Sequence, residues 1–425
     1  MSATDGSLPG IPHQPIRTVL AVATEWWPAH GGLSAFNRRL CVALAAVGLR
    51  VYCVVLTATP AERADAAASG VFLCEALTTT LSPELALARR PRLPEGVRPD
   101  LVIGHGRVTG PAAQSLAQDH FPDAMLIHFI HTAPDELEWW KDRHDDAGER
   151  AEARTRLEVD LARAAHRVCA VGPLLHLRYL NELHPYGVVP GRFDPGFDAT
   201  RATPATAPPG APIRVLVSGR AEDAAIKGLD LAARAMGIVA HRQDPDAAPV
   251  ELVVRGAPAG AAQGLRLKLR AWARNPSLRI VVRPYTTDHE QVLADYRKAS
   301  LVLMPSRCEG FGLVGAEAVV AGTPVLVSNR SGLALLLREV LPARDAARFV
   351  TTVSGHDRTD AERWARAVEA VLHDRPAAFR RSDQLGAVLA GRCTWSGAVG
   401  QLLTSLGIDC TDSLYSIGDM GTLSA

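Results

Sequence analysis

The sequence predicts an α/β protein made of two doubly wound, Rossmann-like domains that face each other across a cleft. Short apolar runs alternate with helical spacings in both halves of the chain, and parallel strands buried on both faces read as such continuous apolar runs. A Pro-, Ala- and Thr-rich run at 198–212 interrupts the alternation. The length of 425 residues suggests two domains of about 150–200 residues each.

The first half begins with the apolar run RTVLAVAT at 17–24, a glycine-bearing loop and a helical spacing. A second run, RVYCVVLTA at 50–58, completes a βαβ unit. Further strands are predicted at 100–104, 124–130 and 166–171. Ligands of such sheets bind beyond the carboxyl ends of the strands, so the residues that follow each strand are the candidates for function.

The second half restarts the pattern after the proline-rich run. Strands are predicted at 213–219, 250–256, 278–284, 301–305 and 323–328, and a final helix within 391–407. We therefore expect a disordered or extended N-terminus at 1–16, a first domain at 17–200, a linker at 201–212, a second domain at 213–390, a closing helix at 391–407 and a polar tail at 408–425.

The composition excludes several classes of protein. With 47% hydrophobic and 21% charged residues and a net charge of +1, the chain is globular and has no broad attraction for nucleic acid. Seven scattered cysteines without a CxxC pair favour buried free thiols over disulfides or zinc. The N-terminus lacks a secretory signal and no run reaches the roughly 18 apolar residues of a membrane span. We expect a cytoplasmic protein.

The segment CEGFGLVGAEAVVAG at 308–322 sets two glutamates around a Gly-Phe-Gly turn at the start of a helix. A helix N-terminus offers unpaired N–H groups and partial positive charge to a phosphate. Gly312 has no side chain to block a ligand, so the N–H groups of Gly312 and Leu313 are candidates for a diphosphate. Glu317 lies one turn further on, where it suits ribose hydroxyls, and Glu309 faces whatever lies beyond the phosphates.

Two cations follow the strand at 213–219. Arg220 ends the strand and Lys227 comes seven residues later, in a chain in which only four of the 46 basic residues are lysine. Two positive charges at this place suit a diphosphate leaving group. The alternative is that both are solvated surface charges, which the neighbouring glutamate motif makes less favourable.

These motifs resemble those of the retaining glycosyltransferases of family 4, which have the GT-B fold. EGFGLVGAE at 309–317 matches the E-x7-E motif, GR at 219–220 with KG at 227–228 matches the diphosphate-binding pair, and GG at 31–32 matches the glycine loop. CTWSGAVGQLL at 393–403 matches the closing segment that crosses to the first domain. The resemblance covers residues 18–407.

The resemblance implies a role for each matching residue. The first domain would bind the acceptor and the second a nucleoside-diphosphate sugar, most simply a UDP- or GDP-sugar, with no other cofactor and no metal. Arg220 and Lys227 would hold the diphosphate and Glu317 the ribose, while Glu309 would contact the transferred sugar. His131 matches the histidine near that sugar. Four further residues complete the donor site: Gly31 and Gly32 at the glycine loop, and Arg283 and Tyr285 near the base.

Several residues have two interpretations. His131 is either an active-site residue or a histidine at a strand end. His105, in GHGRVTG, imitates a dinucleotide-binding glycine loop with the wrong spacing and position, so we reject that motif. Asp145 and Asp146 lie in a charged helical stretch, which favours a solvated face over a metal site. Two pairs, Trp26–Trp27 and Trp139–Trp140, either stack on an acceptor or pack a loop.

The predicted function is therefore transfer of a sugar to an acceptor with retention of anomeric configuration. The acceptor stays open among small molecules, oligosaccharides, lipids and peptides, and so do oligomeric state and peripheral membrane association. Alternatives are a GT-B epimerase or phosphorylase and a nucleotide-sugar-binding protein without transfer activity. A Rossmann oxidoreductase would need GxGxxG at the first turn, and residues 24–37 do not contain it.

Overall fold

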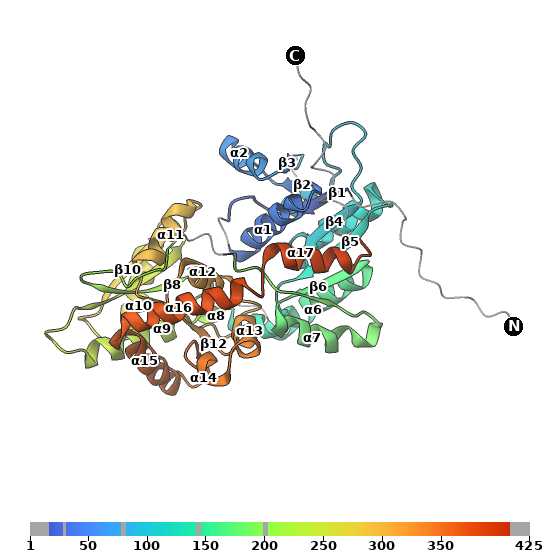
Figure 1. The fold of residues 1–425 in the computed structure, drawn as a ribbon. Coiled ribbons are helices and arrows are strands. Elements are labelled where there is room, and N and C mark those ends of the chain that lie inside the picture. The colour runs from blue at the N-terminus through green and yellow to red at the C-terminus, as the bar shows by residue number, and fades with distance from the viewer. Residues whose placement is uncertain (1–16, 29–30, 78–81, 142–145, 199–202, 409–425) are drawn as a thin grey trace, which may run out of the picture.

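The computed structural model consists of two lobes, each built on one parallel sheet (Figure 1). It describes residues 17–28, 31–77, 82–141, 146–198 and 203–408. The predicted fold class of two doubly wound parallel sheets is confirmed. The predicted N-terminal segment at 1–16 and almost all of the tail at 408–425 lie outside the described residues.

The first sheet has the strand order β3-β2-β1-β4-β5-β6-β7. Its strands are β1 (Thr18–Val22), β2 (Arg50–Val55), β3 (Val71–Glu75), β4 (Leu101–His105), β5 (Met125–Ile130), β6 (Arg167–Val171) and β7 (Gly191–Phe193). The helices of this lobe are α1 (Gly32–Ala46), α2 (Pro60–Ala68), α3 (Pro83–Leu87), α4 (Gly106–Ser115), α5 (Pro134–Leu137), α6 (Ala147–Ala164) and α7 (Pro173–Leu183).

The second sheet has the order β10-β9-β8-β11-β12-β13. Its strands are β8 (Ile213–Ser218), β9 (Val250–Ala257), β10 (Arg279–Pro284), β11 (Leu301–Met304), β12 (Val325–Ser328) and β13 (Val350–Thr351). The helices are α8 (Ala224–Lys227), α9 (Leu229–Arg242), α10 (Ala262–Ala273), α11 (His289–Lys298), α12 (Leu313–Ala321), α13 (Gly332–Val340), α14 (Ala343–Ala346), α15 (Asp357–His373) and α16 (Arg375–Ala390), with α17 (Trp395–Thr404) last.

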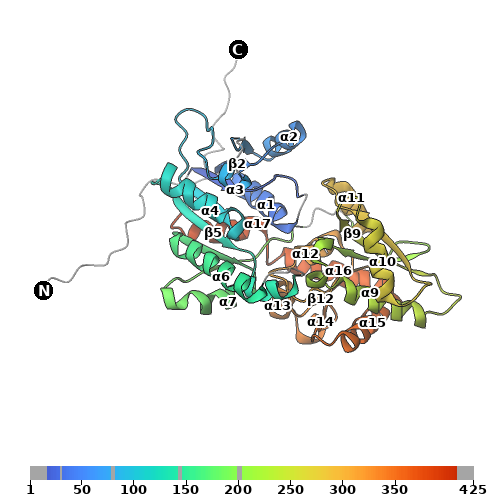
Figure 2. The same ribbon diagram turned by 180° about the vertical axis from the view of Figure 1, so that it is seen from behind.

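Successive side chains of each strand point to opposite faces of the sheet, so the core is divided into layers. In β1, Val19 packs in the cluster that contains α1, whereas Leu20 packs with α4 on the other face. In β8, Val215 faces α9 and α15, whereas Leu216 faces the layer of α12 and α16. Figure 2 shows α4 and α6 on the face of the first sheet opposite α1. Each strand is thus buried on both sides, which explains its unbroken apolar sequence.

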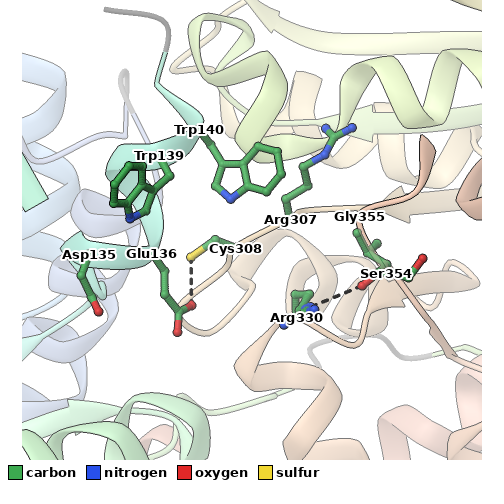
Figure 3. Close-up of a pocket in the computed structure, with 10 residues that line it drawn as sticks. Asp135, Glu136, Trp139, Trp140, Arg307, Cys308, Arg330, Ser354 and Gly355 are labelled. Carbon is green, nitrogen blue, oxygen red and sulfur yellow. Dashed lines mark hydrogen bonds between the residues drawn. The ribbon is translucent and has the colours of Figure 1, made fainter. Parts of the chain in front are cut away.

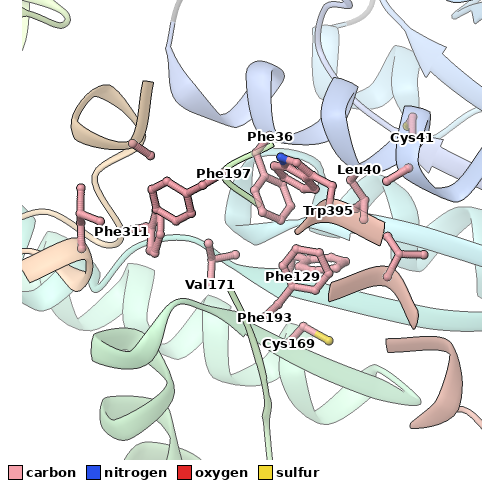
Figure 4. Close-up of a cluster of buried hydrophobic side chains, with 14 of the residues drawn as sticks. Phe36, Leu40, Cys41, Phe129, Cys169, Val171, Phe193, Phe197, Phe311 and Trp395 are labelled. Atoms are coloured by element: carbon pink, nitrogen blue, oxygen red, sulfur yellow. The ribbon is translucent and has the colours of Figure 1, made fainter. Parts of the chain in front are cut away.

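The chain crosses between the lobes twice, and the last helix returns to the first lobe. Helix α16 lies on the second lobe and α17 packs against α1 (Figure 1). Trp395 of α17 packs edge-to-face against Phe36 with the ring centroids 5.4 Å apart, and lies 6.0 Å from Phe193 (Figure 4). The crossings are joined by two hydrogen bonds, from Phe197 N to Cys393 O (2.8 Å) and from Trp395 N to the Asp198 carboxylate (3.0 Å).

The lobes also touch at the ends of their sheets. Arg192 of β7 forms an ion pair of 2.6 Å with Glu339 of α13. Gly310, in the loop after β11, lies so close to the first lobe that a Cβ there would be 2.2 Å from the carbonyl oxygen of His131. The loops that follow the strands of the two sheets therefore face each other, where the sequence places its candidate site.

Candidate functional site

Lys227 and Glu309 meet beyond the ends of two neighbouring strands. Because β8 pairs with β11, the loops that follow them are adjacent, and the Lys227 ammonium lies 2.6 Å from a carboxylate oxygen of Glu309. Ser306 donates a hydrogen bond to the same oxygen (3.2 Å). Gly228 makes this turn possible, because its φ is +66° and a Cβ would lie 2.2 Å from the Pro305 carbonyl oxygen.

The glycine turn after Glu309 opens helix α12. Gly312 has a φ of +108°, and a Cβ there would lie 2.7 Å from the end of the Met304 side chain. Gly312 is the N-cap, and no side chain among the described residues caps this helix. Backbone N–H groups at the first turn of α12 are therefore available to an anion, and the helix dipole favours one.

The first-lobe glycines face this region across the cleft. A Cβ on Gly31, where φ is +146°, would lie 3.7 Å from the Arg220 side chain, and one on Gly32 would lie 3.0 Å from that of Leu313. Arg220 itself forms an ion pair of 2.9 Å with Asp223. Five of the predicted donor-site residues thus lie together: Gly31, Gly32, Arg220, Lys227 and Leu313.

Glu317 lies in α12, and its carboxylate is fixed by a neighbour that the sequence did not reveal. The hydroxyl of Tyr296 donates a hydrogen bond of 2.9 Å to Glu317. Tyr296 comes from α11 and is buried, and this burial, together with the Glu317 charge, raises the pKa of its hydroxyl. The tyrosine stays protonated and holds one carboxylate oxygen, which leaves the other for a ligand.

The two residues predicted near the base lie at the edge of the second sheet, two strands from β8. Arg283 at the end of β10 forms an ion pair with the buried carboxylate of Asp295, so a partner inside the protein holds it. The hydroxyl of Tyr285 donates to Glu222 (3.0 Å), and burial and Glu222 raise its pKa. Glu222 lies two residues after Arg220 in the loop after β8, so Tyr285 contacts the loop that carries Arg220, whereas Arg283 faces Asp295.

The partly buried His131 is part of a chain of hydrogen bonds that runs to the buried His105 and Asn37. Its Nε2 lies 3.0 Å from Nδ1 of His105, whose Nε2 lies 2.9 Å from the amide oxygen of Asn37. That oxygen is an acceptor, so the partners assign a proton to His105 Nε2, a bare Nδ1 to His105 and a proton to His131 Nε2. In this arrangement Nδ1 of His131 is a hydrogen-bond acceptor.

The two hydrogen-bonded histidines, His105 and His131, are both neutral. Burial lowers the pKa of His131 from 6.5 to about 3, with a smaller contribution from the nearby His128. Burial also lowers the pKa of His105 well below its usual value. With its Nε2 proton directed at His105, a neutral His131 offers Nδ1 as a hydrogen-bond acceptor and adds no charge to the site.

His105 and Asn37 are therefore hydrogen-bonded neighbours of the candidate residue His131 that sequence reasoning missed. The glycine-loop motif that we rejected spans the end of β4 and the start of α4, and the histidine inside it contacts His131. A signal was present, since His105 ends β4, His131 directly follows β5, and the two strands are neighbours.

The two tryptophan pairs differ in burial and in their surroundings. Trp26 is buried and donates to Asp65 (2.7 Å), and Trp27 donates to the same carboxylate (3.3 Å). Asp65 of α2 thus holds Trp26 inside the first lobe, so the ring of Trp26 has no exposed face on which an acceptor could stack. Trp139 and Trp140 are 66% and 39% exposed, and they line a cavity between the lobes (Figure 3).

The acidic pair lies at a helix start. Asp145 is outside the described residues, and Asp146 caps α6 by accepting from the N–H groups of Gly148 and Glu149. Within the described ranges, no group of three or more His, Cys, Asp or Glu side chains is arranged to hold a metal ion. No helix in that part of the chain is long and apolar enough to cross a membrane.

Comparison with known proteins gives matches along most of the chain. Residues 20–402 match the model of a family described as "Family 4 Glycosyltransferase in conflict systems". A D-inositol 3-phosphate glycosyltransferase 2 from Catenulispora acidiphila is 30% identical over 317 residues, 70% of this chain and 68% of that protein. A D-inositol 3-phosphate glycosyltransferase from Pseudarthrobacter chlorophenolicus is 28% identical over 88% of this chain and 90% of that protein.

Solved structures share the fold at low identity. A sucrose-phosphate synthase from Thermosynechococcus elongatus superposes with a TM-score of 0.67 at 20% identity, over 92% of this chain and 99% of that one. HepE from Anabaena, solved in complex with UDP and glucose, gives a TM-score of 0.60 at 15% identity, over 92% and 99% of the two chains.

Proposed function

The chain belongs to family 4 of the glycosyltransferases and is a retaining enzyme of the GT-B fold, and we propose that it takes its sugar from a nucleoside-diphosphate sugar bound between Gly31–Gly32 and the loops after β8 and β11. A UDP- or GDP-sugar is the donor we expect. UDP is the nucleotide in the HepE complex, so we rank a UDP-sugar ahead of a GDP-sugar.

The contact between Lys227 and Glu309 carries this proposal. Two loops from neighbouring strands bring an ammonium and a carboxylate to 2.6 Å, beside Arg220 and the uncapped start of α12. The positive groups suit a diphosphate, whereas the carboxylate suits sugar hydroxyls. Lys227 has three N–H donors, so it serves Glu309 and a phosphate oxygen together.

The reaction breaks the bond between the anomeric carbon and the β-phosphate oxygen. Negative charge then grows on the leaving diphosphate, and Arg220, Lys227 and the N-terminus of α12 stabilise it. Glu309 and the neutral His131 orient the sugar by hydrogen bonds. We place no carboxylate as a covalent nucleophile, and infer that the acceptor oxygen attacks on the face that the diphosphate leaves while its proton passes to the departing phosphate oxygen.

A thermal-shift screen of UDP-glucose, UDP-N-acetylglucosamine, GDP-mannose and ADP-glucose tests the donor assignment. Ligand at about 100 times its Kd adds about 2.7 kcal/mol to the free energy of unfolding, so one sugar nucleotide should raise the melting temperature clearly above the others. If none raises it, the donor assignment is wrong. An NMR assay that resolves the anomers of the product tests the mechanism, because inversion contradicts front-face attack.

A further inference from the structure

A cavity of about 580 Å³ lies between the lobes beside the loop that carries Glu309. The first lobe contributes Glu136, Trp139 and Trp140, and the second contributes Arg307, Cys308 and Arg330 (Figure 3). Its volume lies within the range of about 300–1,000 Å³ that is usual for small-ligand sites. Cys308 directly precedes Glu309, and Glu136 follows His131 by five residues, so the cavity adjoins both candidate site loops.

The tryptophans present apolar rings to this cavity. Both belong to the 3₁₀ turn Glu138–Trp140, and Trp139 is the more exposed of the two, at 66%. The guanidinium of Arg307 lies 5.2 Å from the centre of the Trp140 ring and supports it from the second lobe. Large apolar rings with a polar edge are suited to stacking on the C–H faces of a ligand.

The polar groups of the cavity are arranged for hydroxyls rather than for a phosphate. Arg307 is engaged by Asp230 (2.7 Å) and Asp357 (3.2 Å), so its charge is compensated. Among the described residues, the side chain of Arg330 donates one hydrogen bond, from its Nε to the Val353 carbonyl (3.3 Å), and its terminal nitrogens remain as donors.

Acceptors for hydrogen bonds lie on the opposite wall. Glu136 forms an ion pair of 2.5 Å with Arg178 and accepts weakly from the Cys308 thiol (3.5 Å), and its side chain is half exposed. Asp135 also lines the cavity. Asp135 and Glu136 share one arginine, Arg178, so this wall keeps a negative charge. Because Arg307 has carboxylate partners of its own, that negative charge offsets Arg330, and the cavity has no excess of positive charge to hold a phosphate.

We propose that this cavity is the acceptor subsite and that it takes a neutral sugar ring, which stacks on Trp139 and Trp140 and exchanges hydrogen bonds with Glu136 and Arg330. The proposal rests on the proposed function, because a glycosyltransferase needs an acceptor hydroxyl beside the donor. That hydroxyl oxygen bonds to the anomeric carbon, the bond to the diphosphate breaks, and the hydroxyl proton leaves with the diphosphate.

The test supplies a ¹³C-labelled donor, chosen by the thermal-shift screen, with two pools of acceptors. One pool holds neutral sugars (glucose, mannose, N-acetylglucosamine, maltotriose and myo-inositol), and the other holds the phosphate esters of the same compounds. Mass spectrometry detects the transferred label. We expect transfer to at least one neutral sugar. Transfer only to phosphate esters, or to neither pool, overturns the proposal.

Two variants assign the transfer to the cavity. Trp139→Ala/Trp140→Ala should raise the KM for the neutral acceptor by about 10- to 100-fold, while donor hydrolysis and the donor-induced thermal shift stay as in the wild type. Tyr186→Ala removes another exposed aromatic residue that does not line the cavity. It should leave the acceptor KM and the donor-induced thermal shift unchanged. An unchanged acceptor KM in the double variant overturns the proposal, whereas loss of the wild-type thermal shift overturns the donor assignment instead.

Discussion

Replacement of Lys227 by methionine removes the ammonium and keeps the length of the side chain. In the structure Lys227 lies 2.6 Å from Glu309, and the two side chains are 25% and 17% exposed. Ion pairs that solvent reaches contribute at most about 1 kcal/mol to stability. If Lys227 has a structural role alone, the variant should lose a small amount of folding free energy and keep its catalytic rate.

The proposed role predicts a far larger effect on catalysis. The ammonium acts on the charge that develops as the diphosphate leaves, and loss of one such donor costs about 10²–10³ in rate, or about 2.7–4 kcal/mol. We expect kcat/KM for the donor to fall by this factor while urea unfolding shifts by less than about 1 kcal/mol. The measurement is release of nucleoside diphosphate from the donor found by thermal shift.

A matched control and a double variant make the result specific. Lys268→Met removes an exposed lysine from α10 and should leave both quantities unchanged. Lys227→Met/Glu309→Gln should lose less activity than the sum of the single losses, because the two residues contact each other. If Lys227→Met retains kcat/KM within threefold of the wild type, Lys227 does not hold the diphosphate.

Three further changes test neighbouring parts of the site. Gly312→Ala forces a Cβ into a left-handed turn. It should lower the free energy of unfolding by about 1–3 kcal/mol and weaken donor binding in calorimetry. The control Gly264→Ala, in a helix with open space around the glycine, should instead stabilise the protein by up to about 1 kcal/mol. Tyr296→Phe frees the Glu317 carboxylate and should raise the donor KM by about 2- to 10-fold in steady-state assays; an unchanged KM argues against a ribose role. Because the pKa of His131 is about 3 when folded and 6.5 ordinarily, the unfolded chain binds its proton first, so the contribution of His131 to stability should be constant above about pH 6.5 and fall below it by about 1.4 kcal/mol per pH unit. Urea titrations of the wild type and His131→Gln should show a shallower fall in the variant; equal slopes contradict a buried neutral histidine.

The sequence predicted the main sheets because their strands are buried on both faces. The runs at 17–24, 213–219 and 301–305 contain β1, β8 and β11. It missed β3, β7 and β13, which are edge or short strands: β13 has only two residues, and Phe72 of β3 is 52% exposed. Such strands form because a neighbour offers hydrogen bonds, which no local pattern reveals.

The candidate site was predictable where it depends on position after a strand. Lys227 and Glu309 were singled out because each follows a predicted strand, but their contact was not predicted, since it depends on the pairing of β8 with β11. The link between His131 and His105 was not foreseen, because it depends on side chains that lie 26 positions apart and meet inside the first lobe. The same holds for Trp26, whose burial depends on Asp65 from α2.

The return of α17 to the first lobe affects the order in which the protein folds during synthesis. Trp395 completes the aromatic core around Phe36 and Phe193, yet it is made after the whole second lobe. Domains usually fold as units while the ribosome releases them, the N-terminal one first. Here the N-terminal lobe waits for nearly the last described residues, so a ribosome stalled before residue 395 leaves an apolar surface for chaperones to cover.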